Sequence, residues 1–126
     1  MKGAIIMKAV LILAHGSREK NTEKTLEWVV EGVRKKLHSH LIEGAYLQFS
    51  EKDMEAGIIN LMAKGAKDIT IIPYFLFEGI HIREDIPSEI KALKQKYPEV
   101  TIHFGRILGN DERLVDILVD RIQEAI

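Results

Sequence analysis

The sequence predicts an α/β fold built on a four-stranded parallel sheet, and three observations lead to that prediction. Four short apolar runs alternate with four segments in which apolar residues recur at helical spacing, which gives the order βαβαβαβα. The first run, residues 8–14, is nearly unbroken, as is typical of a parallel strand buried on both faces. Such alternation favours right-handed crossovers and helices on both faces of the sheet. The 126 residues are expected to form a single domain.

The next three elements follow from local patterns. Between residues 19 and 38, apolar residues recur every three or four positions with charged residues between them, which predicts an amphipathic helix. Residues 41–49 are expected to be the second strand. Asp53 is placed to cap the second helix, because its carboxylate can accept hydrogen bonds from the free N–H groups of the first turn. Gly65 is expected to end that helix.

The third strand and helix are marked by proline. Residues 68–73 are rich in isoleucine and stop at a proline, which predicts the third strand. Residues 74–84 are expected to be a loop. Asp85 is expected to cap the next helix, and Pro87 suits its first turn because no N–H is needed there. Residues 100–104 are expected to be the fourth strand.

The last helix is expected to be capped by Asn110 or Asp111 and to bury one side. The residues predicted to line that side are Leu114, Ile117, Leu118, Ile122 and Ala125. Trp28 lies off the main apolar stripe of the first helix. It is either a contact between two copies of the chain or an isolated exposed aromatic residue.

Composition excludes several functional classes. The chain contains eighteen Lys and Arg residues and nineteen Asp and Glu residues, so it has no excess of positive charge to bind nucleic acid. The absence of cysteine excludes disulfides, thiolate nucleophiles and cysteine-ligated metal clusters. No apolar run approaches the roughly 18–20 residues of a membrane span, and a cytoplasmic protein is expected. Met7 is as good a start as Met1, in which case residues 1–7 contain an N-terminal extension.

Two histidines are expected where the parallel strands end, which is the edge that binds ligands in such sheets. His15 follows the first strand and begins the run His15-Gly16-Ser17-Arg18. His81 follows the third strand, two residues after Gly79. A neutral imidazole can bind a divalent metal ion or accept a proton near neutral pH. Each histidine alone has the alternative of a hydrogen-bonded turn residue.

Other residues at this edge have two interpretations. Arg18, Arg83 and Arg106 are either plain surface charges or partners for carboxylates of a ligand. Residues 74–77 are either core or an apolar contact for a flat hydrophobic ring. Gly16-Ser17 resembles the start of a phosphate loop, but no nucleotide-binding glycine motif accompanies it.

Four motifs together resemble the short CbiX-type sirohydrochlorin chelatases, a group of class II chelatases. They are AHGSR at residues 14–18, FSE at 49–51, PxFLxxGxHxxxDIP at 73–87 and LGxDxRL at 108–114. The resemblance implies a chelatase-like lobe with His15 and His81 as the catalytic, metal-handling pair. The substrate-binding residues that we expect are Gly16, Ser17, Arg18, Phe75, Leu76, Phe77, Gly79 and Arg83.

The resemblance also implies an activity. A divalent metal ion, with cobalt expected first and nickel or iron as alternatives, would be inserted into sirohydrochlorin in cobalamin, sirohaem or related tetrapyrrole synthesis. The metal is then a substrate, and no permanently bound cofactor is expected. The longer members of the family contain two such lobes, so a symmetric homodimer is expected here.

The sequence departs from the family pattern at one position, and it is also compatible with two other functions. Many relatives carry a glutamate where this chain has Gln48, so Glu51, Glu78 or water would have to replace it. A non-catalytic carrier of metal or tetrapyrrole would need the same two histidines. A phosphoryl-transfer enzyme with His15 as nucleophile is the more distant alternative.

Overall fold

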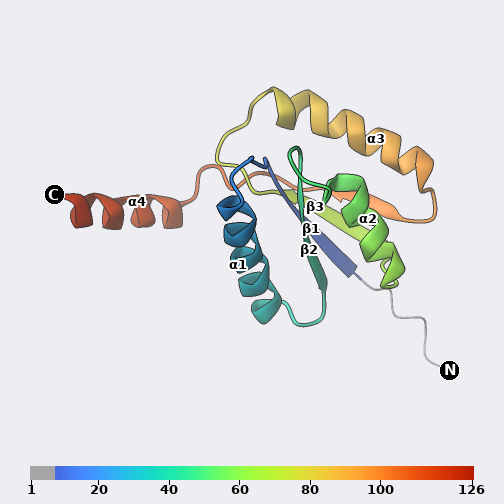
Figure 1. Ribbon diagram of the computed structural model, residues 1–126, viewed down its shortest axis with the longest axis horizontal. Helices are drawn as coiled ribbons and strands as arrows, with labels where there is room; N and C mark the ends of the chain where they lie inside the picture. Colours follow the sequence, from blue (N-terminus) through green and yellow to red (C-terminus); the bar gives the residue numbers. More distant parts are fainter. Residues whose placement is uncertain (1–7) are drawn as a thin grey trace.

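A computed structural model describes residues 8–126, and a four-stranded parallel sheet forms its centre (Figure 1). The strands β1 (Lys8–Ala14), β2 (Leu41–Tyr46), β3 (Asp68–Pro73) and β4 (Thr101–Phe104) lie in the order β2-β1-β3-β4. The helices are α1 (Asn21–Lys36), α2 (Met54–Ala63), α3 (Ile86–Lys96) and α4 (Glu112–Ala125). The predicted fold class is confirmed. The predicted N-terminal extension lies outside the described residues.

Strand β1 lies in the middle of the sheet and is buried on both faces. It pairs with β2 along one side and with β3 along the other. Leu11 and Leu13 are fully buried on one face, and Ile12 is buried on the opposite face. This central position accounts for the unbroken apolar sequence of the strand. It also places His15, the residue after β1, at the centre of the carboxyl edge.

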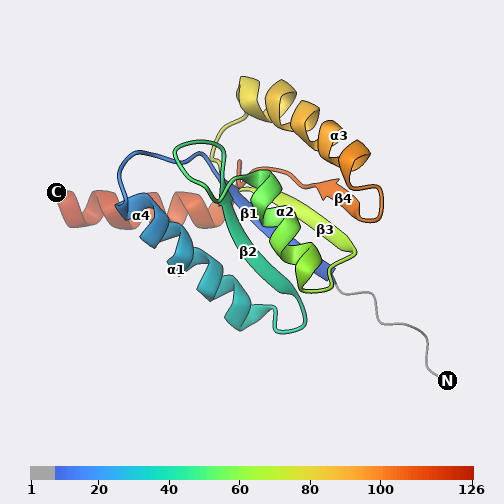
Figure 2. The same ribbon diagram turned by 45° about the vertical axis from the view of Figure 1, so that its right-hand side comes forward.

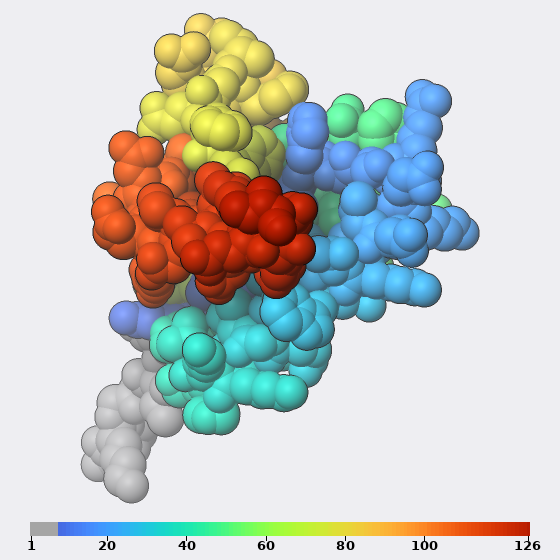
Figure 3. Space-filling model, turned by 90° about the vertical axis from the view of Figure 1, so that its left-hand side faces the viewer, coloured from blue at the N-terminus to red at the C-terminus, as the bar shows by residue number. Residues whose placement is uncertain are grey.

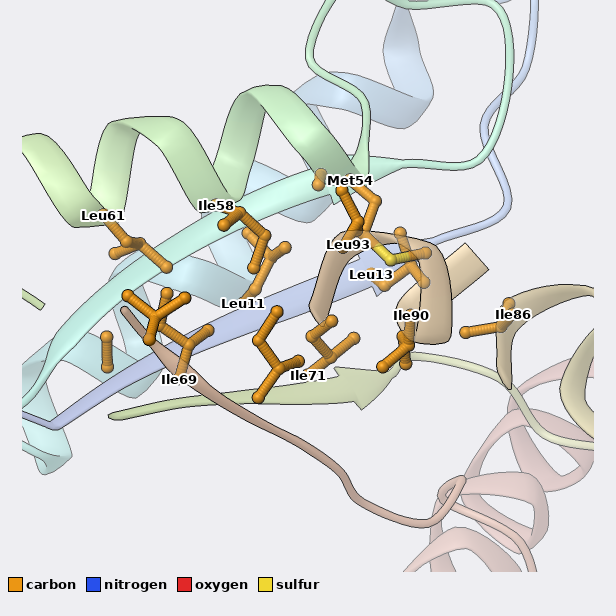
Figure 4. Packing of buried hydrophobic residues seen from close by; sticks show 14 of the residues in the cluster. Leu11, Leu13, Met54, Ile58, Leu61, Ile69, Ile71, Ile86, Ile90 and Leu93 are labelled. Atoms are coloured by element: carbon orange, nitrogen blue, oxygen red, sulfur yellow. The ribbon is translucent and has the colours of Figure 1, made fainter. Parts of the chain in front are cut away.

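The helices divide unequally between the two faces of the sheet (Figure 2). On one face, α2 and α3 pack over the strands, and Figure 4 shows Ile58 and Ile90 from these helices beside Leu11 and Ile71. Each such buried side chain contributes about 1.5–3 kcal/mol to folding. On the other face α1 packs alone, and its cluster consists of Leu26, Val30, Ile12, Ile42 and Tyr46. Helices on both faces are therefore confirmed.

Three helix ends lie where the capping residues in the sequence predicted them. The Asp53 carboxylate accepts a hydrogen bond from the Ala56 N–H at 2.9 Å and caps α2, which ends before Gly65 (φ +98°). The Asp111 carboxylate accepts from the Arg113 N–H at 2.9 Å at the start of α4. The second strand ends at Tyr46, short of its predicted end at residue 49, and Phe49 itself has a φ of +61°, which is not an extended conformation.

Two predictions around residue 81 are wrong. The expected loop contains a π-helical turn, His81–Asp85, that continues directly into α3. Asp85 has a helical backbone and its side chain makes no capping hydrogen bond. The reason is that the preceding turn already supplies an acceptor, since the His81 carbonyl accepts from the Ile86 N–H. The Asp85 carboxylate is thereby left for another partner.

The predicted burial of the last helix is also wrong. Helix α4 points away from the sheet (Figure 1), and none of its residues is buried. Its start is set by the segment before it, because Ile107 packs against the core and the Leu108 N–H donates to the Phe75 carbonyl at 3.0 Å. None of the helices within residues 8–126 combines the length and the hydropathy of a membrane span.

Candidate functional site

The loops at the carboxyl edge are held to one another by backbone hydrogen bonds. In each case an N–H of one loop donates to a carbonyl of a neighbouring segment. The pairs are Leu47 to Ala14 (3.0 Å), Tyr74 to Leu13 (2.8 Å) and Leu108 to Phe75 (3.0 Å). The loops after β2 and β3 are therefore fixed to the end of β1, and the loop after β4 is fixed to the loop after β3, which gives side chains on them defined positions.

His15 and His81 meet at this edge, although 66 positions separate them in the sequence. Their ring centroids are 5.2 Å apart with an interplanar angle of 55°. Phe75 contacts His15 edge to face, with centroids 5.8 Å apart. Both imidazoles are exposed, so a ligand approaching the edge of the sheet can reach them. The predicted pairing of the two histidines is confirmed by this geometry, and their chemical role stays a prediction.

Asp85 is the partner of His81. Its Oδ2 lies 2.9 Å from Nδ1 of His81, one helical turn earlier. When Nδ1 donates its proton to a carboxylate, Nε2 keeps a free lone pair for a metal ion or a proton. Sequence reasoning missed this role because it assigned Asp85 to a helix cap. The spacing of four residues between a histidine and an aspartate on a helix was the available signal.

Gly16 sets the path of the chain directly after His15. Its φ is +93°, a conformation that side chains of L-residues rarely adopt. A Cβ added there would lie 2.1 Å from the Gln48 carbonyl oxygen, well inside contact distance. The loop after β1 thus packs directly on the backbone of the loop after β2. Gly16 positions His15 by allowing this approach.

The remaining predicted residues surround the pair less closely. The guanidinium of Arg18 lies 4.9 Å from the centre of the Phe49 ring, where it forms a cation–π contact. The Ser17 hydroxyl accepts from the Glu19 N–H and so is used within its own loop. Five other residues at this edge are also exposed to solvent: Arg83, Arg106, Glu51, Glu78 and Gly79.

The apolar loop after β3 is mostly not core. Phe77 is 80% exposed and Leu76 51% exposed, whereas Phe75 packs partly against the core. Exposed phenylalanine and leucine beside two imidazoles suit contact with a flat apolar ligand. Within residues 8–126, no group of three or more His, Asp or Glu side chains is arranged to hold a metal ion. This edge therefore differs from a closed structural metal site, which has four protein ligands.

A protein-family model, CbiX, matches residues 9–125 of the chain. Sirohydrochlorin ferrochelatase of Priestia megaterium is 37% identical over 118 residues, which cover 94% of this chain and 44% of the relative. Sirohydrochlorin cobaltochelatase of Saccharolobus solfataricus is 30% identical over 128 residues, which cover 94% of this chain and 95% of the relative. The chain thus spans less than half the length of some relatives and nearly the full length of others.

Solved structures show the same fold. The sirohydrochlorin chelatase SirB of Bacillus subtilis subspecies spizizenii, determined in complex with cobalt, superposes with a TM-score of 0.88 at 28% sequence identity. The superposition covers 94% of this chain and 51% of that one.

Proposed function

The chain belongs to the CbiX family, and from that premise we propose that it inserts a divalent metal ion into sirohydrochlorin. The observation that carries the proposal is the pair of exposed imidazoles, His15 and His81, 5.2 Å apart at the edge where parallel sheets bind ligands. The similarity to sirohydrochlorin chelatases over 94% of the chain supports the same activity.

We propose cobalt as the metal substrate. The relatives that this chain matches over 95% of their length are named cobaltochelatases. Longer relatives include both ferrochelatases and cobaltochelatases, so iron is the competing metal. Two imidazoles bind divalent cobalt, nickel and iron with affinities that follow the general order for these ions, and they add no geometric selection of their own.

The chemistry requires a metal ion that sheds water and two pyrrole N–H groups that lose their protons. Neutral imidazoles hold the ion without adding negative charge, so the tetrapyrrole can take it over. Nε2 of His81 is the free atom of that ring, because Nδ1 faces Asp85. His15 lies beside it and can accept a released proton. Phe75, Leu76 and Phe77 offer an apolar surface to the macrocycle.

Absorbance spectroscopy tests the activity directly. Purified protein mixed with sirohydrochlorin and Co²⁺ is expected to change the tetrapyrrole spectrum faster than the uncatalysed reaction, with many turnovers per protein. Parallel reactions with Ni²⁺ and Fe²⁺ rank the metals. A stoichiometric spectral change without turnover would instead favour the carrier, which needs the same two histidines. The cytoplasmic location stays a prediction.

The arginines at this edge give a second prediction. Sirohydrochlorin carries several carboxylates, and Arg18 and Arg83 are exposed cations near the histidine pair. Arg18→Ala and Arg83→Ala are expected to raise KM roughly two- to fivefold, the size of a solvent-exposed ion pair, with little change in kcat. Added salt should raise KM of the unsubstituted protein in the same way, because it screens these charges.

Steady-state kinetics at several salt concentrations measures both effects, and Lys24→Ala on the outer side of α1 is the control. An unchanged KM in both arginine variants, together with no response to salt, would place carboxylate recognition elsewhere.

Asp85 is proposed as a positioning residue for His81. Asp85→Ala is expected to lower kcat/KM by roughly 10–100-fold, the usual cost of removing the partner of a metal-handling histidine. The reason is that the imidazole loses the acceptor that fixes its orientation and tautomer. Asp85→Asn keeps an oxygen acceptor and should retain more activity. Nitrogen NMR of the His81 ring reports the tautomer, and an unchanged tautomer in Asp85→Ala would contradict this role.

The carboxyl edge of one lobe offers a single wall to a macrocycle. Relatives more than twice as long match this chain over less than half of their length. We therefore propose that two copies of the chain associate as a symmetric homodimer, so that the second copy supplies the opposite wall.

A further inference from the structure

The sequence of helix α4 is amphipathic, which is typical of a helix that packs against another protein surface. One side is apolar along its whole length and the other carries Glu112, Asp116, Asp120 and Glu124. Leu118 is 61% exposed on the apolar side. An isolated helix of 14 residues is marginally stable in water, so this apolar side requires a partner surface. The residues on this side are Leu114, Val115, Leu118, Val119, Ile122 and Ala125, and Ile117, which the sequence predicted there, lies at its border.

A surface of matching character lies open on the sheet. The face that α1 covers over β1 and β2 carries no helix over β3 and β4 in the described part of the chain, and a groove of about 540 Å³ runs there. Its floor includes Val10, Ile12 and Ile72, and α1 contributes Val33 as one wall. Along α1 the groove continues into a second apolar hollow beside Trp28, which is 78% exposed.

The connection to α4 keeps the helix off the groove of its own chain. Leu108 is hydrogen-bonded to the loop after β3, and Ile107 is partly buried against the core. From this anchored segment α4 leaves the carboxyl edge outward instead of turning back along the sheet (Figure 1). Figure 3 looks at the molecule from that side and shows α4 (red) standing in front of the loops of this edge.

From these observations we infer that α4 of one copy lies in the groove of a second copy, and that the second copy returns its own α4 to the first. Such a reciprocal exchange closes with twofold symmetry. The inference rests on the homodimer of the proposed function and names the surface that forms it. Because α4 leaves from the carboxyl edge, the exchange also brings the second copy next to the histidine pair.

The dimensions of the two surfaces agree. At 1.5 Å per residue, 14 residues of helix extend about 21 Å. The seven residues of β1, along which the groove runs, extend about 23 Å at 3.3 Å per residue. Burying six apolar side chains from each of two helices, and the facing groove twice, removes on the order of 1,000–2,000 Å² of surface. That area is in the range of stable protein interfaces.

The charges also agree. Helix α4 carries four carboxylates and two arginines. The charged residues that border the two hollows are three lysines, Lys8, Lys35 and Lys36, and two acidic residues, Glu31 and Asp68. An acidic helix therefore meets a rim with an excess of lysine, which favours this occupant over a basic one.

Matched substitutions test the exchange by solution mass. Leu118→Glu puts a carboxylate on the apolar side of α4, and Gln123→Glu puts the same group on its polar side. Gly32 lines the hollow beside Trp28, and a Cβ added there meets nothing within 4 Å. Gly32→Glu therefore obstructs this hollow, into which the groove continues, without disturbing the fold of one chain, and Gly32→Ala is its small control.

Light scattering and analytical ultracentrifugation are expected to give twice 14.3 kDa for the unsubstituted chain, Gln123→Glu and Gly32→Ala. Leu118→Glu and Gly32→Glu should weaken dimerisation at least about tenfold while circular dichroism stays unchanged, because an unpaired charge is costly to bury. A monomeric unsubstituted chain would overturn the exchange. A dimer insensitive to Gly32→Glu would also overturn it, since α4 would then pair elsewhere.

The mass measurement needs neither metal nor tetrapyrrole. A negative result here therefore leaves the proposed activity standing. An inactive protein that still shows the expected pattern of masses would count against the activity alone.

Discussion

Replacing His81 with alanine is expected to lower the rate of cobalt insertion by roughly 10²–10⁴-fold, the range of an acid–base or ligand group acting in the reaction. Replacing His15 should have an effect of similar size. The two rings lie 5.2 Å apart, so a metal ion or a proton can pass between them, and either substitution breaks that relay. Asp85 is hydrogen-bonded to His81, but within residues 8–126 no set of three or more His, Asp or Glu side chains is arranged to hold a metal ion.

The matched control is His38→Ala. His38 is exposed in the turn between α1 and β2, at the opposite edge of the sheet, and should be dispensable for turnover. Initial rates from absorbance, with circular dichroism to establish folding, measure all three variants. Folded His81→Ala protein with nearly full turnover would remove the assignment of this residue, and the same result for His15→Ala would do so for its partner.

Gly16→Ala is expected to damage both stability and activity. An alanine at φ +93° is strained, and its Cβ would lie 2.1 Å from the Gln48 carbonyl oxygen, so the loop after β1 has to move. We expect a loss of at least about 2 kcal/mol in the free energy of unfolding. His15 is the preceding residue, and a displacement near 1 Å of a catalytic group costs on the order of 10²-fold in rate.

Gly79→Ala is the control for stability, because a Cβ added at Gly79 meets nothing within 4 Å. Urea unfolding of both variants and of the unsubstituted chain gives the comparison. If Gly16→Ala unfolds at the same urea concentration as Gly79→Ala, the close packing of the two loops does not constrain the fold.

The sequence alone was sufficient for the sheet and for the meeting of His15 and His81 at its carboxyl edge. An apolar run such as residues 8–14 is excluded from an exposed position by its hydration cost, which made β1 identifiable. The alternation of strands and helices then brought His15 and His81 to one edge, since parallel strands all end on the same side. Capping by Asp53 and Asp111 was equally local, because a carboxylate needs only the next turn of backbone N–H groups.

The roles of Asp85 and Gly16 depend on tertiary contacts that a local sequence pattern does not predict. Asp85 bonds His81 and does not cap α3, because the backbone of residues 81–85 forms a helical turn that satisfies the N–H groups first. The need for glycine at position 16 likewise follows from the position of the loop after β2, whose Gln48 carbonyl leaves no room for a Cβ.

Helix α4 shows the difference most clearly. The periodicity of its sequence predicted that one side of the helix is apolar, and this prediction was correct. What this side packs against is decided by the direction in which the chain leaves β4, which Ile107 and Leu108 fix through contacts with the core and with Phe75. A hydrophobic stripe predicts that the apolar side of the helix is buried, because the free energy of folding or association depends on the apolar area removed from water. Which surface covers that side depends on the direction of the helix, and only the tertiary structure provides that direction.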